Sequence, residues 1–343
     1  MSILDPSTMR MPLTKRQSDR IAELKAQEFF QFADPDPCFA CGNNIFETVA
    51  EKDRYGFSLN YCMCGECGYL FANPYYTDTC LSQFYQQHYS VIYGRSVSDR
   101  RHFEGEYLKT SSNILPLVKR HHPQAQCILD IGCGFGGSLA AFPKTWRRIG
   151  YDFEGKNLEF GRKLGLDMRE ISKLNDDKNK YDVVMMNQVL EHLRNPVEIL
   201  VQVVNLLRQK GILYIEVPGI MSMKMRKADP RLAFKNAHRH FFSLSSLAQV
   251  AEHAELCLVD GDETIYAVFR KKDELEYFPK KVSSVNSKSM RLLLTEYSSH
   301  IPVKNIRLLG LLKLFNPLFV FKKLIQKIRV IRLRRLYKIL KNN

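Results

Sequence analysis

The sequence contains no long uncharged apolar segment, no internal repeat and no low-complexity tract. None of its apolar runs approaches the ~20 residues that a membrane-spanning helix requires, so we expect no transmembrane segment. The first 32 residues are polar and charged, without the apolar stretch of a secretory signal peptide. We therefore expect a cytoplasmic protein whose cysteines stay as thiols or bind metal instead of forming disulfides.

Acidic residues are missing from the C-terminal part of the chain. The net charge is +15, yet residues 301–343 hold twelve Lys and Arg and no Asp or Glu. Removing these twelve charges leaves only +3 for the first 300 residues. A nucleic-acid-binding protein needs a basic surface on its folded body. The charge distribution therefore argues against nucleic acid as the partner of the body of this protein.

Four cysteines form two Cys-x-x-Cys pairs, Cys38/Cys41 and Cys64/Cys67, with 22 residues between Cys41 and Cys64. Zinc prefers four tetrahedral thiolate or imidazole ligands, and a Cys-x-x-Cys turn directs two sulfurs toward one ion. A glycine follows the second cysteine of each pair and permits the tight turn. The polar, turn-rich surroundings fit poorly with the alternative, in which the thiols pack as small hydrophobic groups. The four cysteines therefore predict a closed, structural zinc site.

Short apolar runs alternate with helix-length segments between residues 127 and 272. Such alternation is typical of a parallel sheet with crossover helices, and two runs joined near Gly261 predict a hairpin. The predicted fold class is α/β, with a doubly wound, mostly parallel seven-stranded sheet that ends in an antiparallel C-terminal hairpin. The expected strands are 127–131, 147–151, 167–171, 181–186, 211–217, 256–261 and 264–270.

The rest of the chain is arranged around this sheet domain. A weak helical pattern precedes Asp34-Pro-Asp-Pro37, and a second helix is expected from Phe103 to His121. We predict five segments: an N-terminal helical segment at 1–34, a zinc-ribbon module at 35–75, a tyrosine-rich bridge with a helix at 76–126, the sheet domain at 127–272, and a basic amphipathic helical tail at 273–343.

A glycine-rich turn, Asp130-Ile-Gly-Cys-Gly-Phe-Gly136, follows the first expected strand of the sheet domain. Its glycines let the backbone bend sharply and bring a ligand close to the N-terminus of the next helix. Asp152, twenty residues after Gly132, is placed to accept hydrogen bonds from ribose hydroxyls. This spacing alone leaves dinucleotide and adenosyl cofactors undecided. Asp130 and Asp152 could also serve only as a turn cap and a surface acid.

These residues, followed in order by Tyr181 to Pro196 and Gly211 to Pro218, resemble the class I S-adenosylmethionine-dependent methyltransferases over roughly residues 127–270. The resemblance implies S-adenosylmethionine as cofactor. It implies that Asp130 holds the turn or the cofactor amino group, that Asp152 binds the ribose, and that the remaining contacts come from Gly132, Gly134, Gly136, Asn187 and Gln188. The adenine contact stays unassigned because Glu170-Ile-Ser-Lys173 offers no clear match.

A zinc ribbon ahead of this domain is similar to an arrangement in sugar and cell-surface polysaccharide methyltransferases, which implies a sugar or glycolipid acceptor. Methyl transfer requires an aligned acceptor, exclusion of water and a group that takes up a proton, for which histidine is suited. The candidate catalytic residues are His192, His238 and His240, with packing as the alternative role of each. Tyr75, Tyr76, Tyr85 and Tyr89 either roof the acceptor pocket or join the zinc module to the sheet domain.

Two other functions stay open. The chain could be an RNA base methyltransferase with a zinc module, although Asn187-Gln-Val-Leu190 lacks the Asn/Asp-Pro-Pro-aromatic signature of amino methylation on bases. It could also be a non-catalytic zinc-ribbon interaction protein with a degenerate cofactor fold, although its glycines and Asp152 are intact.

The tail contains an amphipathic pattern between Leu318 and Leu340, with apolar residues on one helical face and basic residues opposite. Arg332 and Arg335 interrupt the apolar side and would have to extend toward water. Such a helix predicts attachment to an anionic membrane surface, docking on the body or on another subunit, or RNA binding. We therefore consider a cytoplasmic protein that is peripheral to the membrane.

Overall fold

The computed structural model describes residues 3–8, 12–94, 99–153, 155–177, 180–222, 230–272 and 285–298. The predicted amphipathic helix at 318–340 therefore lies outside the described residues. Within the described ranges, no helix is both long and apolar enough to cross a membrane. The strands are β1 (Phe46–Lys52), β2 (Ser58–Cys64), β3 (Leu70–Ala72), β4 (Cys127–Ile131), β5 (Arg147–Asp152), β6 (Asp167–Glu170), β7 (Tyr181–Asn187), β8 (Leu207–Glu216), β9 (His240–Phe241), β10 (Leu256–Gly261) and β11 (Tyr266–Lys271).

Local sequence features explain where the helices begin. The first begins at a capping box, in which Thr14 and Gln17 satisfy each other's backbone N–H groups, and it buries Ile21 and Leu24. The expected helix at 103–121 is present as two α-helices joined by a π-turn at Thr110–Ile114. The α-helices are α1 (Lys15–Ala26), α2 (Asp78–Gln87), α3 (Tyr89–Tyr93), α4 (Asp99–Lys109), α5 (Leu115–His121), α6 (Gly137–Ala140), α7 (Lys156–Lys163), α8 (Pro196–Leu206), α10 (Leu244–Glu252) and α11 (Ser287–Ser298).

Seven strands form one sheet with the order β10-β11-β8-β7-β4-β5-β6. β4 pairs with β5, and β5 with β6, in parallel, whereas β10 and β11 form an antiparallel hairpin and β11 is antiparallel to β8. β4 is buried along its whole length, which agrees with its apolar sequence apart from Asp130. The predicted α/β fold class, with its mostly parallel seven-stranded sheet and C-terminal hairpin, is confirmed.

Two strands begin at other residues than expected, and several others end one residue earlier or later. β8 begins at Leu207 instead of 211. Residues 208–210 are polar and exposed, so they show no apolar pattern that would indicate a strand. β11 begins at Tyr266 instead of 264, because the Asp262 side chain accepts hydrogen bonds from the backbone N–H and the hydroxyl of Thr264 and holds that residue in a turn.

The chain forms two compact units, and one of them contains the described residues 99–183. This unit carries β4, β5 and β6, with α4 packed against α6 and α7 against β6. Asp182 accepts hydrogen bonds from the backbone N–H groups of Gln126 and Cys127 at 2.7 and 2.9 Å, which fixes the start of β4. The glycine-rich turn follows directly from the other end of this buried strand.

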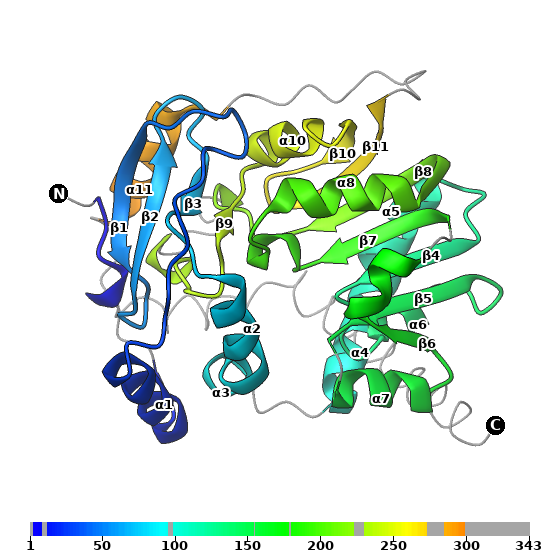
Figure 1. Ribbon diagram of the computed structural model, residues 1–343. Helices are drawn as coiled ribbons and strands as arrows, with labels where there is room; N and C mark the ends of the chain where they lie inside the picture. Colours follow the sequence, from blue (N-terminus) through cyan, green and yellow to red (C-terminus); the bar gives the residue numbers. More distant parts are fainter. Residues whose placement is uncertain are drawn as a thin grey trace, which may run out of the picture. The chain divides into compact units, whose positions relative to one another are not determined.

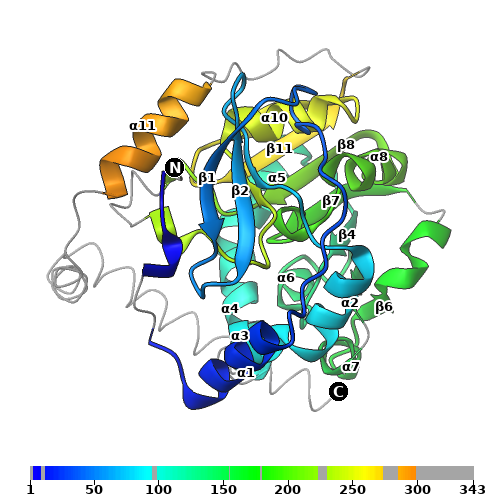
Figure 2. The same ribbon diagram turned by 60° about the vertical axis from the view of Figure 1, so that its left-hand side comes forward.

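The other unit combines the N-terminal residues, up to 96, with residues 184–299. It contains a second, four-stranded sheet with the order β1-β2-β3-β9, in which every pair is antiparallel. Figure 1 shows β9 beside the blue strands, although it lies far later in the sequence, and Figure 2 shows β1 and β2 from a second side. The cysteine-bearing sheet thus includes a strand from the segment that carries His240.

Tyrosines fill the core of this unit. Tyr75 and Tyr76 are 1% and 0% exposed, and both belong to the core cluster beneath β1, β2 and β3. The Tyr75 hydroxyl donates a hydrogen bond to the Asn236 carbonyl at 3.0 Å. Tyr75 therefore links this core to the segment that contains Asn236.

Candidate functional site

The glycine-rich turn adopts a backbone conformation that requires glycine. Gly132, Gly134 and Gly136 have φ angles of +75°, +53° and +81°, in the left-handed region. A Cβ atom on Gly136 would lie 2.6 Å from Leu166 Cδ1. The turn therefore depends on glycine for both its backbone angles and its close packing, and it leads into α6 at Gly137.

Asp152 is joined to this turn by hydrogen bonds. Its Oδ2 accepts from the Gly134 N–H at 2.6 Å, and its Oδ1 accepts from its neighbour Phe153 N–H at 2.7 Å. Burial raises the pKa of the Asp152 carboxyl, an effect that these two backbone donors oppose. The structure thus brings together the turn and the acid that the sequence indicated, and the carboxylate shapes the turn as well as facing it.

Asp130 lies beneath the turn, at the end of β4. It is 2% exposed, and among the described residues its Oδ1 has no hydrogen-bond partner. Burial, with the neighbouring carboxylates Glu106 and Asp152, raises its pKa well above the usual range. A buried carboxylate oxygen without a donor is costly. A ligand that supplied an N–H donor at this place would remove that cost.

Glu106 is a residue of this site that the sequence did not reveal. It lies on α4, and its Oε2 accepts a hydrogen bond from the Gly137 N–H at 3.2 Å. Burial, followed by repulsion from Asp152, raises its pKa to about 7. No motif includes it, because its partners lie about thirty residues later in the chain.

β7 ends at Asn187, and Gln188 follows it directly. Gln188 is exposed and has a φ of +58°, and its N–H donates to the Glu216 carbonyl on β8 at 2.7 Å. A non-glycine residue with a positive φ is uncommon and often marks a functional turn. The backbone bend at Gln188 turns the chain out of the sheet toward Glu191 and His192.

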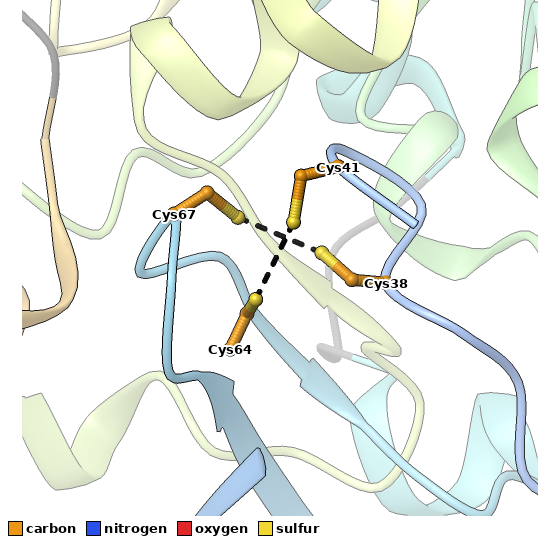
Figure 3. A group of neighbouring side chains, drawn as sticks. All are labelled: Cys38, Cys41, Cys64 and Cys67. Carbon is orange, nitrogen blue, oxygen red and sulfur yellow. Dashed lines mark hydrogen bonds between the residues drawn. The ribbon is translucent and has the colours of Figure 1, made fainter. Parts of the chain in front are cut away.

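The four predicted zinc ligands meet at one point, as Figure 3 shows. Cys38 Sγ lies 3.6 Å from Cys67 Sγ, and Cys41 Sγ lies 3.5 Å from Cys64 Sγ. A tetrahedral zinc with bonds of about 2.3 Å would separate its sulfurs by about 3.8 Å. The Cys38–Cys67 contact lowers the pKa of Cys38 to about 5. The arrangement fits one tetrahedral ion with no position left for water.

Both cysteine knuckles have the same backbone turn. The N–H of Gly42 donates to the Cys38 carbonyl, and the N–H of Gly68 donates to the Cys64 carbonyl. The φ angles of these glycines are +75° and +73°, so each knuckle requires its glycine. The structure therefore explains the glycine that follows the second cysteine of each pair.

His192 and His238 are brought together in the 184–299 unit. Their ring centroids lie 4.7 Å apart at an interplanar angle of 86°. His192 Nε2 lies 3.6 Å from Glu191 Oε1, and Glu191 is 1% exposed. Burial lowers the pKa of His192 to about 4 and that of His238 well below its usual range. Both imidazoles are therefore neutral at physiological pH.

The tautomer of His192 follows from its contacts. Nδ1 lies 2.8 Å from the Ala237 carbonyl and 2.9 Å from the Tyr85 hydroxyl. A carbonyl oxygen only accepts hydrogen bonds, so we assign the proton to Nδ1 and the lone pair to Nε2. Tyr89 also packs edge-on to the ring, with centroids 6.2 Å apart. His192 thus has an oriented basic nitrogen between two tyrosines.

Glu191, His192 and His238 offer ligand atoms within 4.8 Å of one another, which a divalent metal ion could bind. The positive charge of Lys235 acts on His192 and His238, and that of Arg54 acts on His238, and these charges help to lower the pKa values of the two histidines. This positive field disfavours a divalent cation and agrees better with a neutral imidazole that accepts a proton.

His240, the third histidine candidate, lies on β9 with both ring nitrogens engaged. Nδ1 is 2.6 Å from the Tyr69 hydroxyl, and Nε2 is 2.9 Å from the Leu193 carbonyl. It is 1% exposed and packs edge-on against Phe39 beside the cysteine knuckle. The structure does not bring it to the His192–His238 pair.

Comparison with known proteins indicates a family for this chain. A family model described as a methyltransferase domain matches residues 84–260. The search of curated proteins found no match. Among solved structures, the chain is similar to DesVI of Streptomyces venezuelae, at 16% identity and a TM-score of 0.40, over 48% of this chain and 92% of that one.

Two further solved structures are similar. The plantazolicin methyltransferase BpumL, in complex with SAH, is 15% identical with a TM-score of 0.43, over 55% of this chain and 92% of that one. The sugar N-methyltransferase KedS8 from Streptoalloteichus sp is 12% identical with a TM-score of 0.41, over 52% of this chain and 96% of that one. At such identities and TM-scores, these likenesses carry no conclusion about the substrate.

Proposed function

The chain belongs to the methyltransferase-domain family, whose model matches residues 84–260, and we propose that it is a class I S-adenosylmethionine-dependent enzyme. From this premise we propose that it methylates a sugar or glycolipid intermediate of surface polysaccharide biosynthesis. The observation that carries the acceptor side is the oriented Nε2 of His192, flanked by Tyr85 and Tyr89. Tyrosine rings stack on sugar faces, and their hydroxyls bind sugar hydroxyls.

The cofactor-binding residues keep the roles expected from the sequence. Asp152 would bind the ribose hydroxyls, and Gly132, Gly134 and Gly136 would let the methionine portion approach the backbone. Asp130 would accept a hydrogen bond from the cofactor amino group, while Asn187 and Gln188 would line the pocket. When bound, S-adenosylmethionine supplies an activated methyl group, so the protein has to align the acceptor, exclude water and remove a proton.

We assign His192 as the proton acceptor. Its Nδ1–H donates to the Ala237 carbonyl, which leaves Nε2 free to take the acceptor proton as the bond to the methyl group forms. The carboxylate of Glu191, 3.6 Å away, would stabilise the resulting imidazolium. His238 would hold the ring edge-on and His240 would anchor β9, so these two are positioning residues in this assignment.

Replacing His192 by glutamine should lower kcat by about 10²–10⁴-fold, the usual contribution of a general base, and leave S-adenosylmethionine affinity unchanged. Steady-state kinetics and calorimetry would measure the two effects. His121→Gln, on α5, is the matched control and should retain full activity. A His192→Gln enzyme with wild-type kcat would remove this residue from the mechanism.

The pH profile gives a second readout of the same assignment. A base must be neutral to act, and the pKa of His192 is lowered to about 4. The rate kcat/KM should therefore stay constant from neutral pH down to about pH 5 and fall only below it. An acid limb near pH 6.5 would indicate a different, unperturbed base.

The acceptor class is tested by transfer of a labelled methyl group. Zinc-loaded enzyme would be incubated with labelled S-adenosylmethionine and, separately, with nucleotide sugars, lipid-linked sugars and RNA. We expect label in a sugar fraction. Label in RNA that persists after deletion of residues 299–343 would replace the sugar proposal by the RNA alternative. Label in no fraction, together with no cofactor binding, would favour the non-catalytic interaction protein.

We also propose a structural zinc ion at the four cysteines and a peripheral membrane role for the tail. Basic residues near an anionic surface contribute about 1 kcal/mol each, which suits the charge of residues 301–343. Full-length protein should therefore float with anionic vesicles, whereas a chain ending at residue 298 should not. Equal flotation of the two would refute membrane attachment through the tail.

A further inference from the structure

Glu106 places a carboxylate against the glycine-rich turn from a separate element, α4. Its Oε2 accepts from the Gly137 N–H at 3.2 Å, and its Oε1 would lie 2.9 Å from a Cβ atom built on Gly134. The two oxygens therefore span the turn between Gly134 and Gly137. Any side chain at these glycine positions would displace the carboxylate.

Three carboxylates converge on this one turn. Glu106 and Asp152 accept hydrogen bonds from turn N–H groups, and Asp130 lies buried beneath them. In addition to burial, repulsion from Asp152 raises the pKa of Glu106, and repulsion from Glu106 and Asp152 raises the pKa of Asp130. Such a group of like charges is unfavourable in the protein alone. A cationic ligand would relieve the repulsion.

The unpaired oxygen of Asp130 indicates what kind of ligand fits. Asp130 is 2% exposed, and its Oδ1 has no hydrogen-bond partner among the described residues. An ammonium group offers three donors and a positive charge, which would satisfy Asp130 Oδ1 and a free lone pair of Glu106 together. The methionine portion of S-adenosylmethionine carries such a group.

We infer that Glu106 is a cofactor-binding residue that accepts a hydrogen bond from the α-ammonium of S-adenosylmethionine, opposite Asp130. This inference rests on the proposed cofactor site and adds a recognition element from outside the glycine motif. Its simplest alternative is a purely structural role, in which Glu106 only caps the Gly137 N–H at the start of α6. A neutral amide oxygen would serve that capping role as well as a carboxylate does.

Glu106→Gln separates the two roles, because glutamine keeps the size and the acceptor oxygen and removes the charge. Three ligands would be titrated by calorimetry: S-adenosylmethionine, S-adenosylhomocysteine and 5′-methylthioadenosine, which lacks the amino acid portion. We expect Glu106→Gln to weaken the first two by about 10–100-fold, as for loss of a charge-assisted hydrogen bond, and to leave the third unchanged. Glu104→Gln, which removes the partner of Arg100 on the same helix, should change none of them.

The outcomes are distinct. Wild-type affinity of Glu106→Gln for S-adenosylmethionine would overturn the inference. An equal loss for all three ligands, with a lowered Tm, would also overturn it and assign Glu106 a structural role. If the wild-type protein binds none of the three, the cofactor site itself is refuted and the inference falls with it.

Discussion

Replacing Cys64 by serine should abolish zinc binding, unfold the four-stranded sheet and stop methyl transfer. Structural zinc contributes about 10–16 kcal/mol of apparent binding free energy in small zinc domains, and three thiolates do not close a tetrahedral shell. Cys64 is fully buried at the end of β2, so its substitution would also leave the three remaining sulfurs without the metal ion that they share. We expect this to be among the largest effects of any single substitution in the chain.

The loss should reach the histidine pair because the ribbon supports the segment that carries it. β3 pairs with β9, and Tyr69 contacts His240 at 2.6 Å. The fully buried Arg239 forms an ion pair with Asp36, which lies two residues before the first knuckle, and donates a hydrogen bond to the Arg194 carbonyl. Unfolding of the ribbon would therefore remove contacts that hold the chain next to His192 in place.

Zinc content by mass spectrometry, urea unfolding and methyl-transfer rate would measure the effect. Cys62→Ser is the matched control, since Cys62 Sγ donates to the Asn73 carbonyl at 3.4 Å and takes no part in the cluster. The control should retain one zinc per chain and most of the activity. A Cys64→Ser protein with one zinc per chain and wild-type rate would show that the cluster is not a structural metal site.

Replacing Asp152 by alanine should weaken S-adenosylmethionine binding by about 10²-fold or more. The carboxylate would lose its hydrogen bonds to the ribose, each charge-assisted bond contributing about 1.5–3 kcal/mol. It would also release the Gly134 N–H that it now holds at 2.6 Å, so the turn itself would lose its fixed shape. Both effects lower affinity, and both act before the chemical step.

Calorimetric titration with S-adenosylmethionine would measure this loss directly. Asp167→Ala is the control, because Asp167 lies on the neighbouring β6, is exposed and pairs with Arg169. The control should bind with wild-type affinity. An Asp152→Ala protein with unchanged affinity would exclude this carboxylate from the cofactor site.

Features formed by residues close together in the sequence could be predicted from it. β7 and β8 were visible because their buried parts are mostly apolar, and the cysteine and glycine motifs were visible because their chemistry depends on short spacings. Asp152 was identified because it lies twenty residues after Gly132 in the sequence. In each case the interacting residues lie close in the sequence, or an intervening strand fixes where they meet.

The remaining features depend on contacts between distant residues. β9 is only two residues long, too short for any periodic pattern, yet it completes the ribbon sheet. Glu106 lies on a mostly polar helix whose sequence indicates no partner for it. The difference between His192 and His240 was also hidden, because it arises from Tyr85, Ala237, Tyr69 and Leu193, which fold around the two rings.

We propose that the turn at Gly132–Gly136 and the carboxylate of Asp152 bind S-adenosylmethionine. A structure of the zinc-loaded chain soaked with S-adenosylhomocysteine tests it most directly. We expect one bound molecule, with its ribose hydroxyls hydrogen-bonded to Asp152 and its amino group between Asp130 and Glu106. A ligand bound elsewhere, or an Asp152 side chain turned away from an occupied pocket, would contradict the account.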